Sequence, residues 1–247
     1  MLEEQRERKY NYYARIIQKA FKKYFARRQY EKHKLEASDV VYGKKQRRHN
    51  SLNRNFVGDY IGLDCRPSLQ TLVGRREKIF FAEVVKKYDR NFKVTRRDLL
   101  LTGSALFLVG REKVKKGKNK GTYQEVIKRK IEFEILSSVS LSTLQDDFVV
   151  IHVKDNYDSL LEIMFKTEFL SCLNKKYQAK VGRGVNVKFL NNIDVKIKKE
   201  GWGGGGIRQI SFITDSTNQS NCEILKSSGK KLVVSVPPGL PNNSSEY

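Results

Sequence analysis

The sequence is poor in cysteine. Among its 247 residues only Cys65, Cys172 and Cys222 occur, far apart and odd in number. None has the CxxC spacing typical of zinc and redox sites, and a disulfide framework normally needs an even number of cysteines. We therefore expect a reducing, cytosolic setting in which each cysteine is a small buried apolar residue.

Patterns that carry catalysis are also missing. His33, His49 and His152 have no metal-ligand spacing with one another or with cysteine. No G-x-x-x-x-G-K-[ST] loop occurs, which excludes a Walker-type nucleotide site. The glycine-rich stretch 201–206 has no following lysine and lies between two strand candidates, so a hairpin loop with Trp202 on the core is favoured. We expect neither a metal site nor an enzyme activity in this chain.

No long hydrophobic run is present. The longest, Leu99–Gly110, is interrupted by Thr102-Gly103-Ser104 and is too short to cross a bilayer. The N-terminus is charged from Glu3 onward, unlike a signal peptide. Any contact with a membrane is therefore expected to be peripheral.

Acidic residues are few relative to basic ones. The chain has 49 Lys and Arg against 27 Asp and Glu, a net charge of +22, and its 39% hydrophobic content indicates a folded domain. Such a charge favours a polyanionic partner: nucleic acid, an anionic membrane face or an acidic protein.

Residues 2–36 contain no Gly or Pro and are predicted to form one basic amphipathic helix. The order Ile17-Gln18, Lys22, Arg27 and Tyr30 resembles an IQ motif, the calmodulin and light-chain site of myosin necks. That resemblance implies that Gln18, Lys22 and Arg27 hydrogen-bond the lobes of the light chain. It implies that Ile17 and Tyr30 fill the grooves of the same partner.

This motif departs from the usual pattern at two positions. Lys22 stands where Arg is commoner, and Lys23 stands where Gly is expected. The missing glycine leaves open which lobe closes tightly and whether calcium is required. A coiled-coil or core helix is the alternative interpretation of residues 2–36.

A basic linker with a short helical segment is expected at 37–77. Ser38-Asp39 suits a helix cap or break, Lys44-Lys45-Gln46-Arg47-Arg48 is a basic run, and a helix is predicted at Pro67–Val73.

Strand patterns dominate after residue 78. Six or seven antiparallel strands, followed by a helix at Lys166–Lys180, outline a pleckstrin-homology-like barrel over 78–182. A C-terminal β extension at 183–237 is predicted to pack as a meander, and 238–247 begins a Pro-rich linker. The fold class is mainly β with helices. The expected strands are Ile79–Val85, Arg97–Thr102, Ala105–Gly110, Tyr123–Phe133, Val139–Ser142, Phe148–His152, Leu160–Met164, Val185–Phe189, Ile193–Lys198, Ile207–Ile213, Cys222–Lys226 and Leu232–Val236.

Cations at the edge of this scaffold suit a ligand with clustered phosphates. A basic loop at Lys86–Lys93 precedes a hairpin that is predicted to bring Lys87 and Arg97 to one mouth. The surrounding field is predicted to come from Arg90, Lys93 and Arg96, with an auxiliary flexible loop carrying Lys113, Lys115, Lys116, Lys118 and Lys120.

Several long segments resemble the tail-homology-one domain of long-tailed class I myosins over roughly 38–240. They are SLNRNFVGDYIGL, FAEVVKKYDRNFKVTRRDLLLT, LVGREKVKKG, VSLSTLQDDF, YDSLLEIMFKTEFLSCL and KKEGWGGGG. The resemblance implies a neck-and-tail fragment of a monomeric actin motor. Its tail would bind anionic phospholipids, notably phosphatidylinositol bisphosphate, at Lys87 and Arg97.

The same resemblance implies the cellular setting. The motor would link plasma or endocytic membranes to the actin cytoskeleton, with calmodulin or a related light chain on its neck. It implies no cofactor here, because ATP and Mg²⁺ belong to a motor head that this sequence lacks.

Two rival functions share the basic charge. One is a nucleic-acid-binding module, with Tyr88 and Phe92 stacking on bases. The other is an actin cross-linker that sets its basic surface against acidic filaments.

Overall fold

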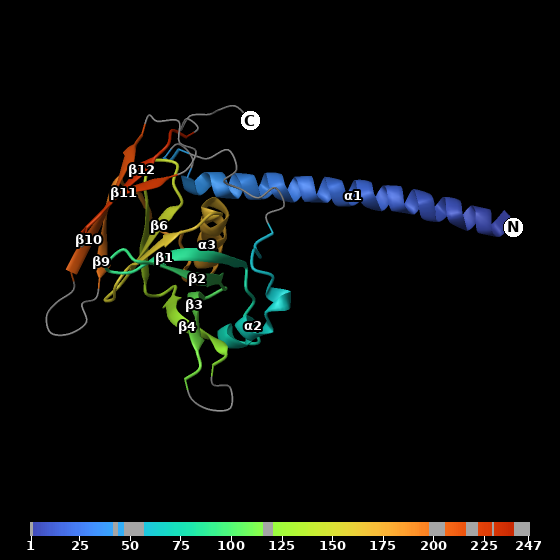
Figure 1. Cartoon of the computed structure of the whole chain (residues 1–247). Helices are drawn as coiled ribbons and strands as arrows, with labels where there is room; N and C mark the ends of the chain where they lie inside the picture. The colour runs from blue at the N-terminus through green and yellow to red at the C-terminus, as the bar shows by residue number, and fades with distance from the viewer. Residues whose placement is uncertain are drawn as a thin grey trace.

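In the computed structural model, a long helix leaves a β-rich body built of two sheets (Figure 1). The structure describes residues 2–41, 44–46, 57–115, 121–197, 206–215, 222–228 and 230–239. Predictions for Trp202, for most of the glycine-rich stretch and for Lys116, Lys118 and Lys120 lie outside these ranges.

The helices are α1 (Leu2–Val41), α2 (Pro67–Val73) and α3 (Lys166–Val181), with a 3-10 turn, η1, at Leu63–Cys65. The first seven strands are β1 (Phe81–Tyr88), β2 (Val94–Leu101), β3 (Ala105–Lys113), β4 (Tyr123–Glu132), β5 (Leu136–Leu141), β6 (Phe148–Val153) and β7 (Ser159–Glu162). The last five are β8 (Val187–Phe189), β9 (Asn192–Ile197), β10 (Gly206–Thr214), β11 (Glu223–Ser227) and β12 (Lys231–Val236).

Helix α1 continues beyond the predicted boundary at residue 36. Its 40 residues span about 60 Å at 1.5 Å per residue, and Ser38-Asp39 lies inside it, so the expected break is wrong. The physical reason is tertiary. Val41 is 3% exposed in the main core, and α1 packs against α3 there, which favours helix up to that contact.

The main sheet has eight strands in the order β4-β3-β2-β1-β7-β6-β5-β8. The predicted mainly β fold of the pleckstrin-homology-like kind is confirmed, as are the turn at Thr102-Gly103-Ser104 and the helix α2. β1 to β7 pair in antiparallel fashion, whereas β8 adds to β5 in parallel, which the sequence did not predict.

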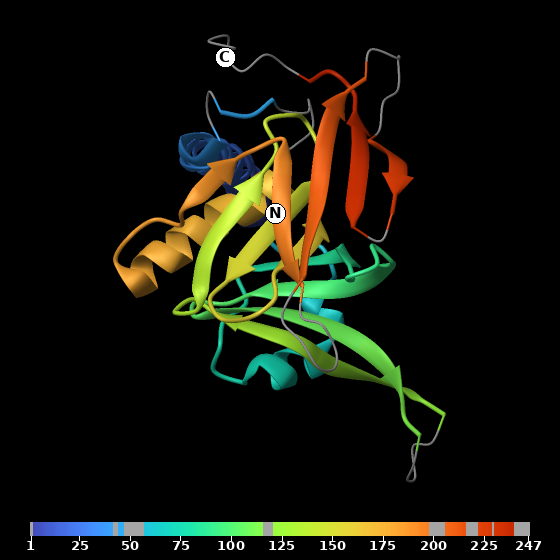
Figure 2. The ribbon, with the colours of Figure 1, turned by 90° about the vertical axis from the view of Figure 1, so that its left-hand side faces the viewer.

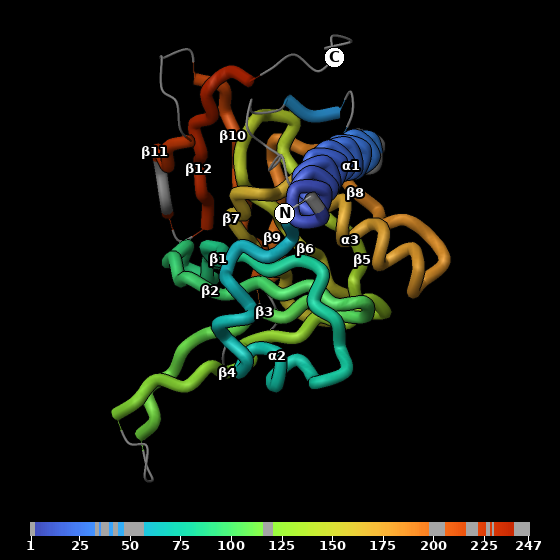
Figure 3. The backbone as a smooth tube through the Cα atoms, turned by 90° about the vertical axis from the view of Figure 1, so that its right-hand side faces the viewer, coloured from blue at the N-terminus to red at the C-terminus, as the bar shows by residue number. Residues whose placement is uncertain are grey.

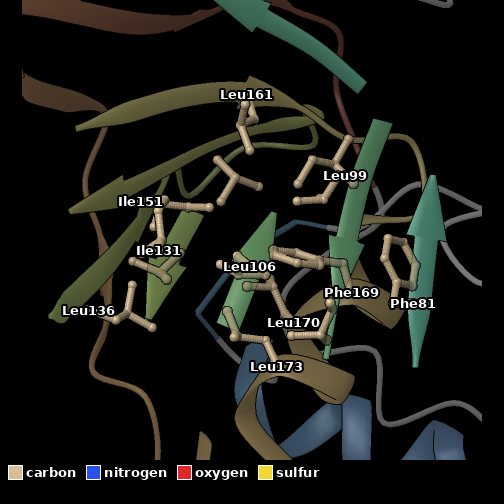
Figure 4. Packing of buried hydrophobic residues seen from close by; sticks show 14 of the residues in the cluster. Phe81, Leu99, Leu106, Ile131, Leu136, Ile151, Leu161, Phe169, Leu170 and Leu173 are labelled. Carbon is tan, nitrogen blue, oxygen red and sulfur yellow. The ribbon is translucent and has the colours of Figure 1, made fainter. Parts of the chain in front are cut away.

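The core of this sheet is closed at one end by α3. Phe169, Leu170 and Leu173 of α3 point into the same cluster as Phe81 of β1 and Leu99 of β2 (Figure 4). These side chains recur at helical spacing, so one face of α3 is apolar and is buried against the sheet. At the opposite end of the sheet, none of the helices that the structure describes forms such a cover.

The second sheet has the order β11-β12-β10-β9 and is not the expected meander (Figure 2). β12 lies between β10 and β11 and runs parallel to β10. Leu232 and Val234 of β12 are fully buried, whereas β11 is short and carries Ile224 and Leu225 in exposed positions. The more apolar strand therefore takes the central place, and β11 is left at the edge.

The turn that joins β1 to β2 is tied to a second core. Tyr88 and Phe92 are 5% and 7% exposed and pack with Phe148 and Phe212, while Phe92 adopts φ 60°. The expected basic loop Lys86–Lys93 is thus partly wrong, because Lys86 to Tyr88 belong to β1. Burial also removes both rings from the surface that base stacking requires.

The segment before the main sheet, which contains Lys45, is anchored to the body by buried ion pairs. The carboxylate of Asp146 accepts hydrogen bonds from the Nζ atoms of Lys45 at 2.8 Å and Lys166 at 3.2 Å. The two ammonium groups hold the pKa of Asp146 at about 2, against the burial that alone would raise it. Burial, reinforced by Lys166, lowers the pKa of Lys45 to about 7.

The helices can be compared with the expectation that any contact with a membrane is peripheral. In the described part of the chain, none of the helices combines the length and the hydropathy that crossing a bilayer requires.

Cys65 is exposed, and Cys172 and Cys222 are half-buried. The expectation that each cysteine is buried is therefore wrong, because the first ends η1 at the surface and the others lie at core margins.

Replacing Asp146→Asn removes the buried carboxylate that the amino groups of Lys45 and Lys166 both contact. We expect a loss of about 3 kcal/mol in the free energy of unfolding at pH 7, measured by urea denaturation. Because the folded pKa of Asp146, about 2, lies below its ordinary 3.8, the stabilisation is present above pH 3.8 and is lost as the pH falls through 2. The difference in the free energy of unfolding between wild type and variant should therefore decrease as the pH falls from 3.8 to 2.

The exposed pair of Lys180 and Glu134, 3.7 Å apart, provides the control. Glu134→Gln should change stability by no more than about 0.5 kcal/mol. A similarly small effect of Asp146→Asn would contradict the anchoring role of the buried ions.

Candidate functional site

Three cationic side chains lie on the inner face of the main sheet, at the end away from α3. Lys87 is opposite Thr95, and Arg97 is opposite Val85, so both share the face of the core residue Val85. Arg129 of β4 precedes Ile131, another core residue, by two positions and is only 8% exposed. We refer to Lys87, Arg97 and Arg129 as the cation triad.

Arg129 connects β4 to the turn between β6 and β7. Its guanidinium donates to the carbonyl of Asp158 at 3.1 Å and to the hydroxyl of Ser159 at 2.7 Å, and also to the carbonyl of Tyr157. No pairing joins β4 to β5 among the described strands, so β4 is an edge strand of the sheet. The hydrogen bonds of Arg129 help to hold this strand against the turn between β6 and β7.

The ring of Tyr157 lies beside two members of the triad. The Arg129 guanidinium carbon is 3.8 Å from the ring centre, and Lys87 Nζ is 5.7 Å from the same centre. Cations over an aromatic face are attracted by its quadrupole, so Tyr157 fixes where both positive groups sit.

The triad is electrostatically unfavourable without an anion. Burial lowers the pKa of Lys87, and Arg129 and Arg97 act in the same direction, with Asp89 opposing them. Burial also lowers the pKa of Arg129. A bound anion would relieve this mutual repulsion.

Arg97 adds an unused donor to the site. Its Nε atom is buried and has no hydrogen-bond partner, while one terminal nitrogen donates to the carbonyl of Arg96 at 2.9 Å. A Cβ atom on Gly110 would lie 3.2 Å from the Arg97 guanidinium carbon, so glycine leaves room for this side chain. A buried N–H donor without a partner is costly and marks a position for an acceptor.

The other predicted cations are placed differently. Arg96 is exposed on the opposite face of β2, where it faces Lys86, because side chains alternate along a strand. Arg90 and Lys93 are exposed in the β1–β2 turn beside the triad's end of the hairpin. Lys113 ends β3, and Lys115 follows it in an arm that projects from the sheet (Figure 2).

Arg129 is the site residue that sequence reasoning missed. A signal was present in the sequence, since Arg129 lies two positions before the apolar Ile131 in an expected strand and so shares its face, which is buried. Its distance in sequence from Lys87 and Arg97 concealed the cluster, because only the sheet order brings β4 near β1 and β2.

Comparison with known proteins identifies the family. A family model described as "Unconventional myosin tail, actin- and lipid-binding" matches residues 47–241. The chain belongs to this family. The predicted resemblance to class I myosin tails is confirmed, and the tail is an actin- and lipid-binding domain. The matched region is not the ATPase head, so this chain is not itself the catalytic part of a motor.

Individual myosins match most of the chain. Myosin IC heavy chain of Acanthamoeba castellanii is 35% identical over 99% of it, and myosin ID heavy chain of Dictyostelium discoideum is 36% identical over 85%. Myosin heavy chain IB of Acanthamoeba castellanii is 33% identical over 92%. The chain spans about a fifth of these relatives, 20%, 19% and 19%. The hSac2 domain of human phosphoinositide phosphatase Sac2 matches 59% of the chain and 92% of that domain, at 15% identity and a TM-score of 0.34, too weak a likeness to support an argument.

The residues of the predicted IQ-like motif are mostly exposed on α1. Ile17 is 67% exposed, and Gln18 and Lys22 are exposed as well. Arg27 is exposed and pairs with Glu31 at 3.1 Å. Tyr30 is half-buried. The other large exposed side chains nearby are Ile16, Phe21, Tyr24 and Phe25.

A serine, a histidine and an aspartate form a hydrogen-bonded chain in the tail. Ser140 Oγ lies 2.8 Å from His152 Nε2, and His152 Nδ1 lies 2.9 Å from Asp158 Oδ2. Ser140 is only 2% exposed within β5, so a substrate cannot reach its hydroxyl. Asp158 also accepts the backbone N–H of Lys196, which ties the main sheet to β9. The arrangement is structural.

A structural role predicts a small and specific effect. Ser140→Ala should lower the free energy of unfolding by about 1 kcal/mol, because one buried hydrogen bond is lost. Both proteins should hydrolyse an activated ester at the rate of buffer alone. Hydrolysis that is present in the wild type and abolished in the variant would contradict this role.

Proposed function

We propose that the tail binds phosphoinositide headgroups at the cation triad. The observation that supports this most strongly is the buried Arg97 Nε without a partner, beside two further cations that repel one another. A headgroup with several phosphates supplies clustered acceptors. Arg97 can form paired hydrogen bonds with a phosphate, whereas Lys87 supplies a compact point charge.

Attachment then has two physical components. Exposed cations of the β1–β2 turn and the β3–β4 arm, among them Arg90, Lys93 and Lys113, draw the tail toward an anionic leaflet. This attraction is set by charge density and weakens with salt. The triad is held in position by Tyr157 and by the hydrogen bonds of Arg129. It distinguishes a headgroup with clustered phosphates from the headgroups of other anionic lipids.

Two neighbouring arginines on β2 make a matched pair for testing this site. Arg97→Ala should weaken binding to vesicles with phosphatidylinositol bisphosphate by about tenfold or more, since a charge-assisted contact in a half-buried site is lost. Arg96→Ala removes the same charge from the opposite face and should change binding by less than about twofold. Vesicle sedimentation measures both.

Phosphatidylserine vesicles of equal surface charge serve as the second comparison, and thermal unfolding verifies that each variant is folded. We expect the two variants to bind phosphatidylserine equally. If Arg96→Ala and Arg97→Ala weaken phosphoinositide binding to the same extent, charge density alone governs attachment and the triad is not a site. Lys87→Ala should reproduce the effect of Arg97→Ala.

We infer that α1 recruits calmodulin or a related light chain. Large apolar side chains on a helix with no tertiary partner are costly in water, and the exposed set around Ile17 and Phe21 needs a cover. A groove that accepts one face of an amphipathic helix meets that need. The bound light chain would stiffen α1 between a motor and the tail.

The double change Ile17→Ala/Gln18→Ala should reduce calmodulin binding by about tenfold or more, because an apolar anchor and a hydrogen-bonding side chain are lost together. Arg6→Ala, an exposed change on the same helix ahead of the motif, should leave binding within about twofold. Calorimetric titration with and without calcium measures both. Equal binding by the double variant and wild type would refute the motif.

In the whole protein these attachments would link membranes to actin filaments, as in endocytosis or membrane trafficking, with a monomeric motor working at plasma or endocytic membranes. The chain spans about a fifth of the length of its relatives, so we propose motor activity for the whole protein and not for this chain. The alternative of a nucleic-acid-binding module loses one support, since Tyr88 and Phe92 are buried.

A further inference from the structure

A second group of cations lies at the opposite end of β1 from the triad. Lys78 Nζ and Lys176 Nζ are 5.5 Å and 3.4 Å from the centre of the same ring, that of Phe80. Lys175 of α3 lies next to this group and, with Lys78, lowers the pKa of Lys176, although burial has the larger effect. We call the group formed by Arg75, Arg76, Lys78, Lys175 and Lys176 the α3-side patch.

The patch is built on fixed elements. Phe80 donates its backbone N–H to the carbonyl of Leu101 at 2.8 Å, which extends the pairing of β1 with β2. Lys176 lies in the helix that closes the main core, one position before the buried Tyr177. Of the two lysines near Phe80, Lys176 therefore lies on α3 and Lys78 lies in the segment that leads into β1.

Acidic residues near the patch leave it positive. Glu77 lies between Arg76 and Lys78, and Glu134 is 3.7 Å from Lys180, farther along α3. The ion pairs of Arg66 with Asp98 and of Lys86 with Glu162 involve residues outside the patch. The five cations of the patch therefore outnumber Glu77, the carboxylate that lies among them in the sequence.

The position of the patch relative to the triad is decisive. Phe80 and Lys87 are seven residues apart along one extended segment, which corresponds to about 23 Å. Figures 2 and 3 show the β1–β2 turn and the β3–β4 arm on one side of the tail and α3 on the other. When the triad faces a bilayer, as proposed above, the patch faces away from it.

We propose that the α3-side patch is the surface through which the tail binds the acidic face of an actin filament. The family is described as both actin- and lipid-binding, and opposite placement allows both partners to be held at once. Nucleic acid fits less well, because the Lys176 ammonium lies 3.4 Å from the centre of the Phe80 ring and occupies a face on which a base would stack. Charge complementarity with carboxylates needs no such face.

The test uses charge reversal in the full chain. Lys78→Glu/Lys176→Glu should weaken cosedimentation with actin filaments by about tenfold or more at about 0.1 M salt, because like charges would then meet across the interface. Binding to phosphatidylinositol bisphosphate vesicles should stay within about twofold. Lys230→Glu/Lys231→Glu changes the net charge equally on the exposed start of β12 and should weaken actin binding by less than about threefold.

A milder pair, Lys78→Gln/Lys176→Gln, keeps much of each side-chain stem on Phe80 and should give a smaller loss in the same direction, with an unchanged thermal midpoint. When wild-type tail, vesicles and filaments are mixed, all three should pellet together at low speed, because the tail links vesicles to filaments. With the Lys78→Glu/Lys176→Glu variant, the vesicles should stay in the supernatant.

Equal weakening of actin binding by the patch and β12 variants would overturn the proposal, as would a wild-type tail that does not bind filaments. Loss of RNA binding in the patch variant with unchanged actin binding would overturn it in favour of a nucleic acid. If Arg97→Ala leaves vesicle binding unchanged while the patch variant loses actin, the lipid site is wrong and the actin surface stands.

Discussion

The structure depends on the burial of the β1–β2 hairpin between two hydrophobic cores. Val85 and Leu99 face the core beneath α3, whereas Tyr88 and Phe92, at the turn, pack into the core of the second sheet. Because the hairpin belongs to the main sheet, the second sheet cannot move relative to it without exposing Tyr88 and Phe92. Lys87 and Arg97 of the cation triad lie on this hairpin and Arg129 lies on β4, so the geometry of the triad is set by packed strands and not by flexible loops.

Placing cations at the end of a closed core has an electrostatic consequence. The inner face of the sheet is apolar up to Val85 and Ile131, and the next inward positions are Lys87 and Arg129. Partial burial strengthens the repulsion between their charges and equally strengthens attraction to a phosphate cluster. The same strand begins beside Phe80 and its two lysines, so one element carries positive charge at both ends.

Much of the architecture could be read from residue patterns. The helix Pro67–Val73 and the turn at Thr102-Gly103-Ser104 were predicted correctly, because proline, glycine and apolar periodicity act locally. The insertion of β12 between β10 and β11 could not be predicted in this way, since it depends on which strand buries more apolar surface. The end of α1 depends on contacts of Val41 with distant residues.

The sequence by itself determined a basic, mainly β tail preceded by a long helix, and it indicated Lys87 and Arg97 as candidate cations. Only the tertiary structure decided which cations lie together. Strand alternation separates Arg96 from Arg97, and sheet order brings Arg129 to the same face from β4. The physical reason is that charge and periodicity are local properties, whereas the neighbours of a side chain are fixed by long-range pairing of strands.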